Sequence, residues 1–293
     1  MNSAGRRAII ALPVILLLAA FIAWAGSQGG YTVSGIPVFA LCVALAFVLQ
    51  WIAFIPAFIL QTEKFYDLMG SITYLSITVI AIFLSPVADA RSWLLLAIVS
   101  VWAVRLGTFL FRRVRAAGED RRFRDIKPSF ARFLLTWTLQ GLWVSLTLAA
   151  ALAAITTMTR RDLGWIGLLG FLVWLLGFGI EVIADQQKSK FRADPQNAGK
   201  FINTGLWSWS RHPNYFGEIV LWIGVALIAV PVLAGWQWLT LISPFFVFIL
   251  LTRVSGVPML EKQADEKWGG QSEYEEYKAR TSALILRPPS TAS

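Results

Sequence analysis

The segment from Ser210 to Glu218 concentrates side chains that could bind a charged ligand. It reads SRHPNYFGE, and its proline suits the first turn of a helix, where a missing N–H costs nothing. The N-terminal N–H groups of that helix, with the positive end of its dipole, would face an anion. Arg211 adds a full charge and a planar fork of donors, and Asn214 and Glu218 share one helix face. The pattern predicts a site for a phosphate-bearing or zwitterionic ligand; the alternative is the plain start of a helix at a membrane interface.

Four ionisable residues lie in or at the ends of long apolar segments, where a charge is costly and is therefore a candidate for function. They are Arg105, Glu181, Asp185 and Glu218. Glu181 and Asp185 are four residues apart and share a helix face. The alternative interpretation is that these residues form structural ion pairs or extend their long side chains to the membrane surface.

Two polar stretches could complete a ligand site. Residues 112–132 hold eight Lys and Arg, which could bind lipid headgroups or grip a 2′-phosphate or a pyrophosphate. Within 258–280, Tyr274 and Tyr277 are three residues apart and could stack on an adenine ring. The alternative is that both tyrosines dock an amphipathic helix onto the headgroups.

The short polar stretch 61–69 contains candidate proton donors. Glu63, Tyr66 and Asp67 lie in it, and a carboxyl group in an apolar site keeps its proton to higher pH and can then donate it. The alternative interpretation is a solvated turn.

The elements that must position these residues are transmembrane helices. The 293 residues are 57% hydrophobic and 15% charged, whereas soluble domains carry about a quarter charged residues. A spanning helix needs roughly 20 mostly apolar residues, which predicts an all-α, polytopic membrane helix bundle of about seven or eight spans. The candidates are 9–25, 36–60, 70–88, 92–111, 133–158, 163–184, 214–234 and 236–252.

The positive charges predict the orientation of this bundle. With alternating spans, one side carries 22 of the 26 Lys and Arg and the other carries only Arg91, Arg160 and Arg161. Because Lys and Arg accumulate on the cytoplasmic side, both termini are predicted to be cytoplasmic. The first span also resembles a cleavable signal peptide, which is kept as an alternative.

The composition excludes several classes of protein. One Cys and one His exclude an internal disulfide and a multi-histidine metal site, and neither a Rossmann fingerprint nor a P-loop is present. The net charge of +9 points to membrane lipids rather than nucleic acid as a partner. We expect one membrane domain over 1–288, followed by a disordered tail at 289–293.

The stretch GLWSWS that begins at Gly205, followed by RHPNYFGE, resembles the steroid 5-alpha-reductase superfamily, in particular its uncharacterised bacterial branch. The similarity runs over 61–288. Isoprenylcysteine carboxyl methyltransferases and related phospholipid methyltransferases carry a similar Arg-His-Pro-x-Tyr motif and use it for S-adenosylmethionine. For the reductases, the resemblance implies NADPH in the cytoplasmic half of the bundle. With the two tyrosines of the C-terminal stretch, the expected cofactor-binding residues are Arg105, Asp185, Arg211, His212, Asn214, Tyr215, Glu218, Tyr274 and Tyr277.

Two departures from the steroid enzymes concern the substrate. Their Gln-Glu pair corresponds here to Gln61 with the acid displaced to Glu63, and Trp102 stands where they place a catalytic tyrosine, three residues before Arg105. Indole donates a hydrogen bond but does not readily release its proton, which argues against a steroid substrate. Tyr66 or Tyr74 could supply the missing hydroxyl.

The resulting hypothesis is an NADPH-dependent oxidoreductase acting on the CH–CH group of a lipophilic, enone-type substrate in a bacterial inner membrane. Gln61, Glu63 and Tyr66 are the expected catalytic residues, which would polarise the substrate oxygen. One alternative is an S-adenosylmethionine-dependent methyltransferase acting on a lipid or prenylated substrate. A non-catalytic lipid-binding or scaffold protein is the third hypothesis, and the oligomeric state stays open.

Overall fold

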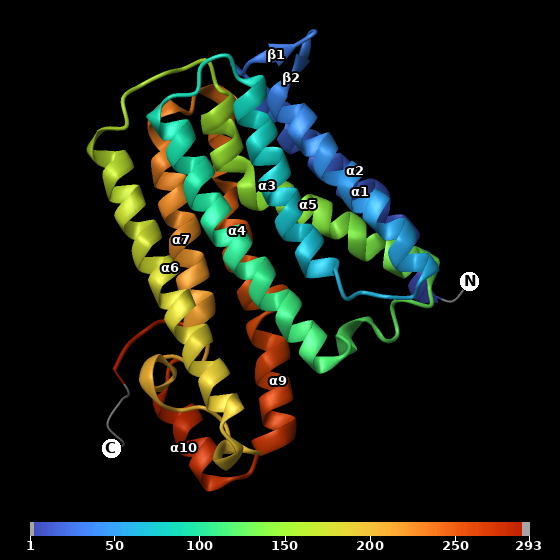
Figure 1. Ribbon diagram of the computed structural model, residues 1–293, viewed down its shortest axis with the longest axis vertical. Helices are drawn as coiled ribbons and strands as arrows, with labels where there is room; N and C mark the ends of the chain where they lie inside the picture. Colours follow the sequence, from blue (N-terminus) through green and yellow to red (C-terminus); the bar gives the residue numbers. More distant parts are fainter. Residues whose placement is uncertain (1–2, 289–293) are drawn as a thin grey trace. The chain divides into compact units, whose positions relative to one another are not determined.

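The protein is a bundle of long helices, as a computed structural model of the chain shows (Figure 1). It describes residues 3–288, apart from the side chains of Ser3, Ala4 and Arg121, so the predicted tail at 289–293 lies outside the described residues. Eight helical segments in this range are long and apolar enough to cross a membrane, which confirms the predicted all-α polytopic fold. The α-helices are α1 (Ser3–Ser27), α2 (Val38–Ile59), α3 (Tyr66–Leu84), α4 (Ala90–Ala117), α5 (Phe130–Thr156), α6 (Gly164–Ala193), α7 (Pro213–Ala229), α8 (Ile242–Ile249), α9 (Val257–Trp268) and α10 (Ser272–Arg280). A short hairpin of β1 (Thr32–Val33) and β2 (Ile36–Pro37) joins α1 to α2.

The chain divides into two compact units. The first comprises Met1–Gly167 and Ile228–Ser243, and the second comprises Leu168–Leu227 and Pro244–Ser293. The single domain expected over 1–288 and the cytoplasmic position of both termini stay predictions.

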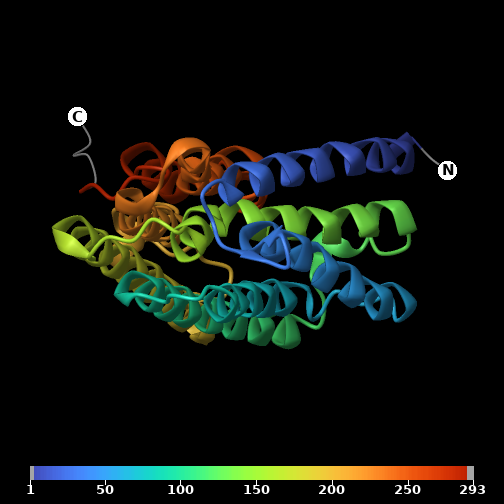
Figure 2. The same cartoon turned by 90° about the horizontal axis from the view of Figure 1, so that it is seen from above.

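Helix α5 forms the centre of the first unit. It packs against α1, α2 and α3, and Figure 2 shows it in green between α1 and α2. The second half of α5 is rich in fully buried alanines from Ala149 to Ala154, and small side chains let helix backbones approach closely. Near its start, Phe133 and Trp137 pack into an aromatic cluster with Tyr66 and Phe123.

Glycines bring α6 and α7 into backbone contact in the second unit. A Cβ atom added at Gly177 would lie 2.4 Å from the backbone nitrogen of Leu221, and one at Gly217 would lie 2.6 Å from the carbonyl oxygen of Gly177. The same close approach occurs at Gly224, seven residues later, where an added Cβ atom would lie 2.5 Å from the backbone nitrogen of Trp174. Only glycine fits such an approach, so these residues fix how the polar ends of α6 and α7 face each other.

The last predicted span, 236–252, is not a continuous α-helix. It starts as a 3₁₀-helix over Gly235–Leu241, continues as α8, and ends as a π-helix over Leu250–Val254. Helices α4 and α6 also run beyond the predicted span ends at 111 and 184, to Ala117 and Ala193. These extensions are polar but compatible with a helix, so the apolar segment ends before the helix does. Asp185 therefore lies within α6 and not in a loop.

Candidate functional site

A pair of polar side chains joins the facing ends of α6 and α7. The Asn214 side-chain nitrogen donates a hydrogen bond to Asp185 Oδ1 at 3.2 Å. Asp185 is buried, and so is Glu181 one turn earlier on α6. Glu218 lies one turn after Asn214 and is half-buried. Helix α7 begins at Pro213, as predicted, so three acidic groups and an amide surround the start of a helix in the second unit.

Arg211 binds the C-terminal helices. Its Nε and Nη2 atoms donate to the two carboxylate oxygens of Glu261 at 3.1 and 2.8 Å, a bidentate pair with α9. Its Nη1 atom donates to the carbonyl oxygens of Lys278 and Thr281, at 2.8 and 2.6 Å. Four of the five N–H groups of a guanidinium are therefore used within the second unit. The sequence predicted a ligand-binding arginine and gave no sign of this partnership.

His212 shares the carboxylate of Glu261 but leaves one ring nitrogen without a partner. Its Nε2 atom lies 2.8 Å from Glu261 Oε1. Because a carboxylate only accepts, we assign the proton of the neutral ring to Nε2, which leaves a lone pair on Nδ1. That Nδ1 atom is buried and has no hydrogen-bond partner among the described residues. Burial also lowers the pKa of His212 below its usual value, and Tyr215 stacks on the ring at 5.7 Å.

Tyr274 and Tyr277 pack inside the second unit. Both rings lie 5.3 Å from the ring of Phe201. The Tyr274 hydroxyl donates to Asp265 at 3.0 Å, and that of Tyr277 donates to the carbonyl oxygen of Trp207 at 2.6 Å. Burial raises the pKa of both hydroxyls. Each tyrosine thus uses its ring and hydroxyl in packing, and their expected role in stacking on adenine stays a prediction.

The first unit contains the three expected catalytic residues. Gln61 adopts a positive φ of 50°, is exposed, and donates to the carbonyl oxygen of Phe58 at 2.7 Å. Glu63 is buried and accepts hydrogen bonds from Lys127 Nζ and, at 2.8 Å, from the backbone nitrogen of Asp120. Glu63 thus accepts hydrogen bonds in these contacts and donates none.

Tyr66 points elsewhere. Its hydroxyl donates to the carbonyl oxygen of Thr136 at 3.0 Å. In the described part of the chain, the side chains of Gln61, Glu63 and Tyr66 therefore bond to different partners. Trp102 packs edge-on against Tyr74, the other candidate for the missing hydroxyl, with ring centroids 5.1 Å apart. The catalytic role of all these residues stays a prediction, as does cofactor binding by Arg105, which belongs to the same unit.

Comparisons with known proteins agree with the resemblance seen in the motifs. A family model described as "Protein of unknown function (DUF1295)" matches residues 53–281. This range includes every residue of the two sites described above.

Curated relatives match over shorter ranges. An uncharacterized protein of Schizosaccharomyces pombe is 25% identical over an alignment of 192 residues that covers 54% of this chain and 56% of that protein. The 3-oxo-5-alpha-steroid 4-dehydrogenase 1 of Rattus norvegicus is 33% identical over 87 residues, or 29% of this chain and 31% of the enzyme. The probable O-methyltransferase ustE of Ustilaginoidea virens is 29% identical over 98 residues, or 33% of this chain and 32% of that protein. The chain thus spans about half the length of the first relative and about a third of the other two. No solved structure matches it.

Proposed function

The chain belongs to the DUF1295 family, and we propose that it is an integral membrane reductase that uses NADPH to reduce a conjugated C=C bond of a lipophilic substrate. Its similarity to 3-oxo-5-alpha-steroid 4-dehydrogenase 1 supports an oxidoreductase, since that name describes a dehydrogenase of 3-oxo-5-alpha-steroids. The observation that carries the proposal is the hydrogen bond between the buried Asp185 and the half-buried Asn214, together with the unpartnered, buried Nδ1 atom of His212.

These side chains fit the nucleoside part of a dinucleotide. Ribose hydroxyls and the nicotinamide carboxamide offer O–H and N–H donors, and a buried acceptor without a partner is costly. His212 Nδ1 is such an acceptor. Asp185 is buried and accepts a hydrogen bond from Asn214, and a carboxylate is an acceptor suited to a ribose hydroxyl. His212 and Asp185 would therefore accept from the cofactor, and Asn214 would hold Asp185 in place.

Few hydrogen-bond donors at this site are available for the phosphates of NADPH. Arg211 has a single N–H group left beside its bonds to Glu261 and to two backbone carbonyls. It could offer that N–H to a phosphate oxygen without losing its other bonds. Any stronger contact requires Glu261 to release the guanidinium.

NADPH, when bound, would supply a hydride for the β-carbon of the enone, and a proton from solvent would complete the reduction at the α-carbon. The part of the protein is to bind the cofactor and to polarise the substrate oxygen with hydrogen-bond donors. Gln61 and Tyr66 have such donors, each now directed at a backbone carbonyl. Glu63 accepts from Lys127 and a backbone N–H, so we assign donation to Gln61 and Tyr66 and a positioning role to Glu63.

A methyltransferase is the second candidate, and one observation favours it. The start of α7 is surrounded by the acidic residues Glu181, Asp185 and Glu218, while the arginine beside it is already paired. S-adenosylmethionine carries a positive sulfonium and no phosphate, so it matches this charge distribution better than NADPH does. The similarity to a probable O-methyltransferase points the same way.

Titration calorimetry on the full chain in lipid nanodiscs tests the proposal, with NADPH, NADH and S-adenosylmethionine as probes. We expect NADPH to bind most tightly and Asp185→Asn to weaken it about 5- to 150-fold, the effect of about 1–3 kcal/mol for a lost buried contact. Asp194→Asn is the matched control, because Asp194 is exposed just beyond α6 and should leave binding unchanged. Binding of S-adenosylmethionine without NADPH would establish the second candidate, and equal affinities of both variants would refute the site.

A further inference from the structure

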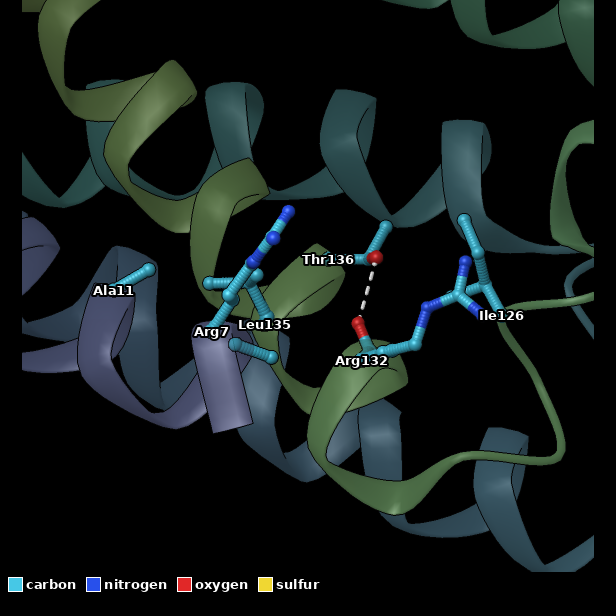
Figure 3. A pocket seen from close by; sticks show the side chains of 7 residues that line it. Arg7, Ala11, Ile126, Arg132, Leu135 and Thr136 are labelled. Carbon is cyan, nitrogen blue, oxygen red and sulfur yellow. Dashed lines mark hydrogen bonds between the residues drawn. The ribbon is translucent and has the colours of Figure 1, made fainter. Parts of the chain in front are cut away.

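The first unit has a pocket of about 420 Å³ where the starts of α1 and α5 meet the loop before α5. This volume lies within the range of small-molecule pockets. Figure 3 shows its two cationic side chains, Arg7 from α1 and Arg132 from α5. The rest of the lining is largely apolar and includes Ala8, Ala11 and Leu135.

The polarity of the pocket changes with depth. Both helices begin at this end, so a residue later in either sequence lies further along the span. Ala11 is four residues beyond Arg7, and Thr136 is four beyond Arg132, which places each about 6 Å deeper along its helix axis. The Thr136 hydroxyl donates to the carbonyl oxygen of Arg132 at 2.9 Å, so its own helix satisfies it (Figure 3). The pocket is therefore cationic at its rim and apolar below.

The two cations at the rim retain free donors. Arg7 is exposed and makes no hydrogen bond or ion pair with any residue in the described range. Arg132 is half-buried and donates from Nη1 to the carbonyl oxygen of Asp125 at 2.7 Å, which leaves other N–H groups available. No carboxylate lines this pocket within the described part of the chain. Two positive charges in a lining without a carboxylate attract an anion, and arginine suits phosphate geometry.

We propose that this pocket binds the head of an anionic phospholipid. The phosphate lies between Arg7 and Arg132, and the glycerol and first acyl carbons lie against Ala8, Ala11 and Leu135. An amphiphile fits better than free phosphate because most of the wall is apolar. The exposed side chains of Ile10, Val14 and Leu17 continue along one face of α1 and would carry an acyl chain beyond the pocket.

The predicted orientation agrees with this occupant. The same end of α1 and α5 is predicted to be cytoplasmic from the distribution of Lys and Arg, and anionic lipids are enriched in that leaflet. The site is independent of the cofactor and of the reaction, so its failure would leave the proposed function untouched.

Native mass spectrometry of the full chain in non-ionic detergent tests which molecule binds. Phosphatidylglycerol, phosphatidylcholine and glycerol 3-phosphate are added separately. We expect a preference for phosphatidylglycerol, with glycerol 3-phosphate about tenfold weaker because it lacks about 1.4 kcal/mol of apolar burial. Equal binding of phosphatidylcholine would overturn the selectivity for anions. Binding of glycerol 3-phosphate as tight as that of phosphatidylglycerol would show an anion site and overturn the lipid assignment.

Variants test where the lipid binds. Arg7→Gln and Arg132→Gln should each weaken phosphatidylglycerol binding about fivefold, which corresponds to about 1 kcal/mol per cation near the membrane surface. Arg6→Gln is the matched control, because Arg6 is exposed on the same helix and does not line the pocket. Ala11→Leu fills the apolar wall without changing charge and should weaken binding as well. If Arg7→Gln and Ala11→Leu both bind like Arg6→Gln, the pocket is not the site.

Discussion

Glu261 is expected to hold the C-terminal helices to the start of α7. Its carboxylate accepts from Arg211 Nε and Nη2 and from His212 Nε2, at 3.1, 2.8 and 2.8 Å. The substitution Glu261→Gln keeps the shape of the side chain and removes its charge. It leaves Arg211 and His212 facing an amide that accepts through only one of its two terminal atoms.

The size of the effect follows from the burial of the pair. Breaking a fully buried pair costs about 3–5 kcal/mol. Here the Arg211 and Glu261 side chains are 14% and 19% exposed, and glutamine keeps one acceptor, so we expect a loss of about 2–3 kcal/mol. At 2–4 °C for each kcal/mol, the melting temperature in detergent should fall by about 4–12 °C. Hydrogen exchange should locate the loss in α9 and α10, because these helices depend on the pair.

A control on the same helix separates the effect of breaking the Arg211–Glu261 pair from the general effect of removing a negative charge. Glu266 also lies on α9, but its contact with Lys262 is exposed and measures 3.8 Å. Such pairs contribute about 0.3–0.5 kcal/mol, so Glu266→Gln should leave melting and exchange nearly unchanged. If Glu261→Gln and Glu266→Gln behave alike in both measurements, Glu261 does not hold α9 and α10, and the reasoning is wrong.

Two further predictions concern the same unit. Burial lowers the pKa of His212, so as the pH falls this imidazole is protonated in the unfolded chain before it is protonated in the folded protein. The free energy of unfolding is therefore at its full value above about pH 6.5 and decreases as the pH falls toward the folded-state pKa. Melting curves at about pH 8 and about pH 5.5 measure this loss, which His212→Gln should reduce. Gly177→Ala should lower the melting temperature, because its Cβ atom would meet the backbone of Leu221 at 2.4 Å, whereas Gly179→Ala, with no atom within 4 Å, should maintain or raise it through helix propensity. Equal melting temperatures of these two glycine variants would contradict the close approach of α6 and α7.

The sequence predicted the fold well where apolar length alone decides it. All eight predicted spans correspond to helical segments, because a bilayer admits few structures other than helices of sufficient length. Hydropathy predicts less accurately where a span departs from α-helical geometry or where a helix continues into a polar segment. The segment from Gly235 to Val254 is partly 3₁₀ and partly π-helical, and hydropathy carries no signal for this.

The candidate site was predicted in part, for a physical reason. Asn214 and Glu218 share a turn of α7, and Glu181 and Asp185 share a turn of α6, so local spacing was enough to find them. The partners of Arg211 lie about 50 and 70 residues further along the chain. No local sequence pattern distinguishes an arginine that binds a phosphate ligand from one that forms an ion pair with a distant carboxylate.

The pairing of Arg211 also gives a way to distinguish the two cofactors. A phosphate of NADPH that binds Arg211 lies close to the negative Glu261 carboxylate, which repels it, and beyond the one remaining N–H it also competes with that carboxylate for the guanidinium. Removing that charge by Glu261→Gln should then tighten NADPH binding about fivefold, the effect of about 1 kcal/mol of relieved repulsion and competition. S-adenosylmethionine has no phosphate and should gain nothing from the substitution. Calorimetry of both ligands, below the melting temperature of the variant, makes the comparison. If Glu261→Gln leaves NADPH affinity unchanged or weaker, Arg211 is not its phosphate ligand, and its role is to hold α9 and α10.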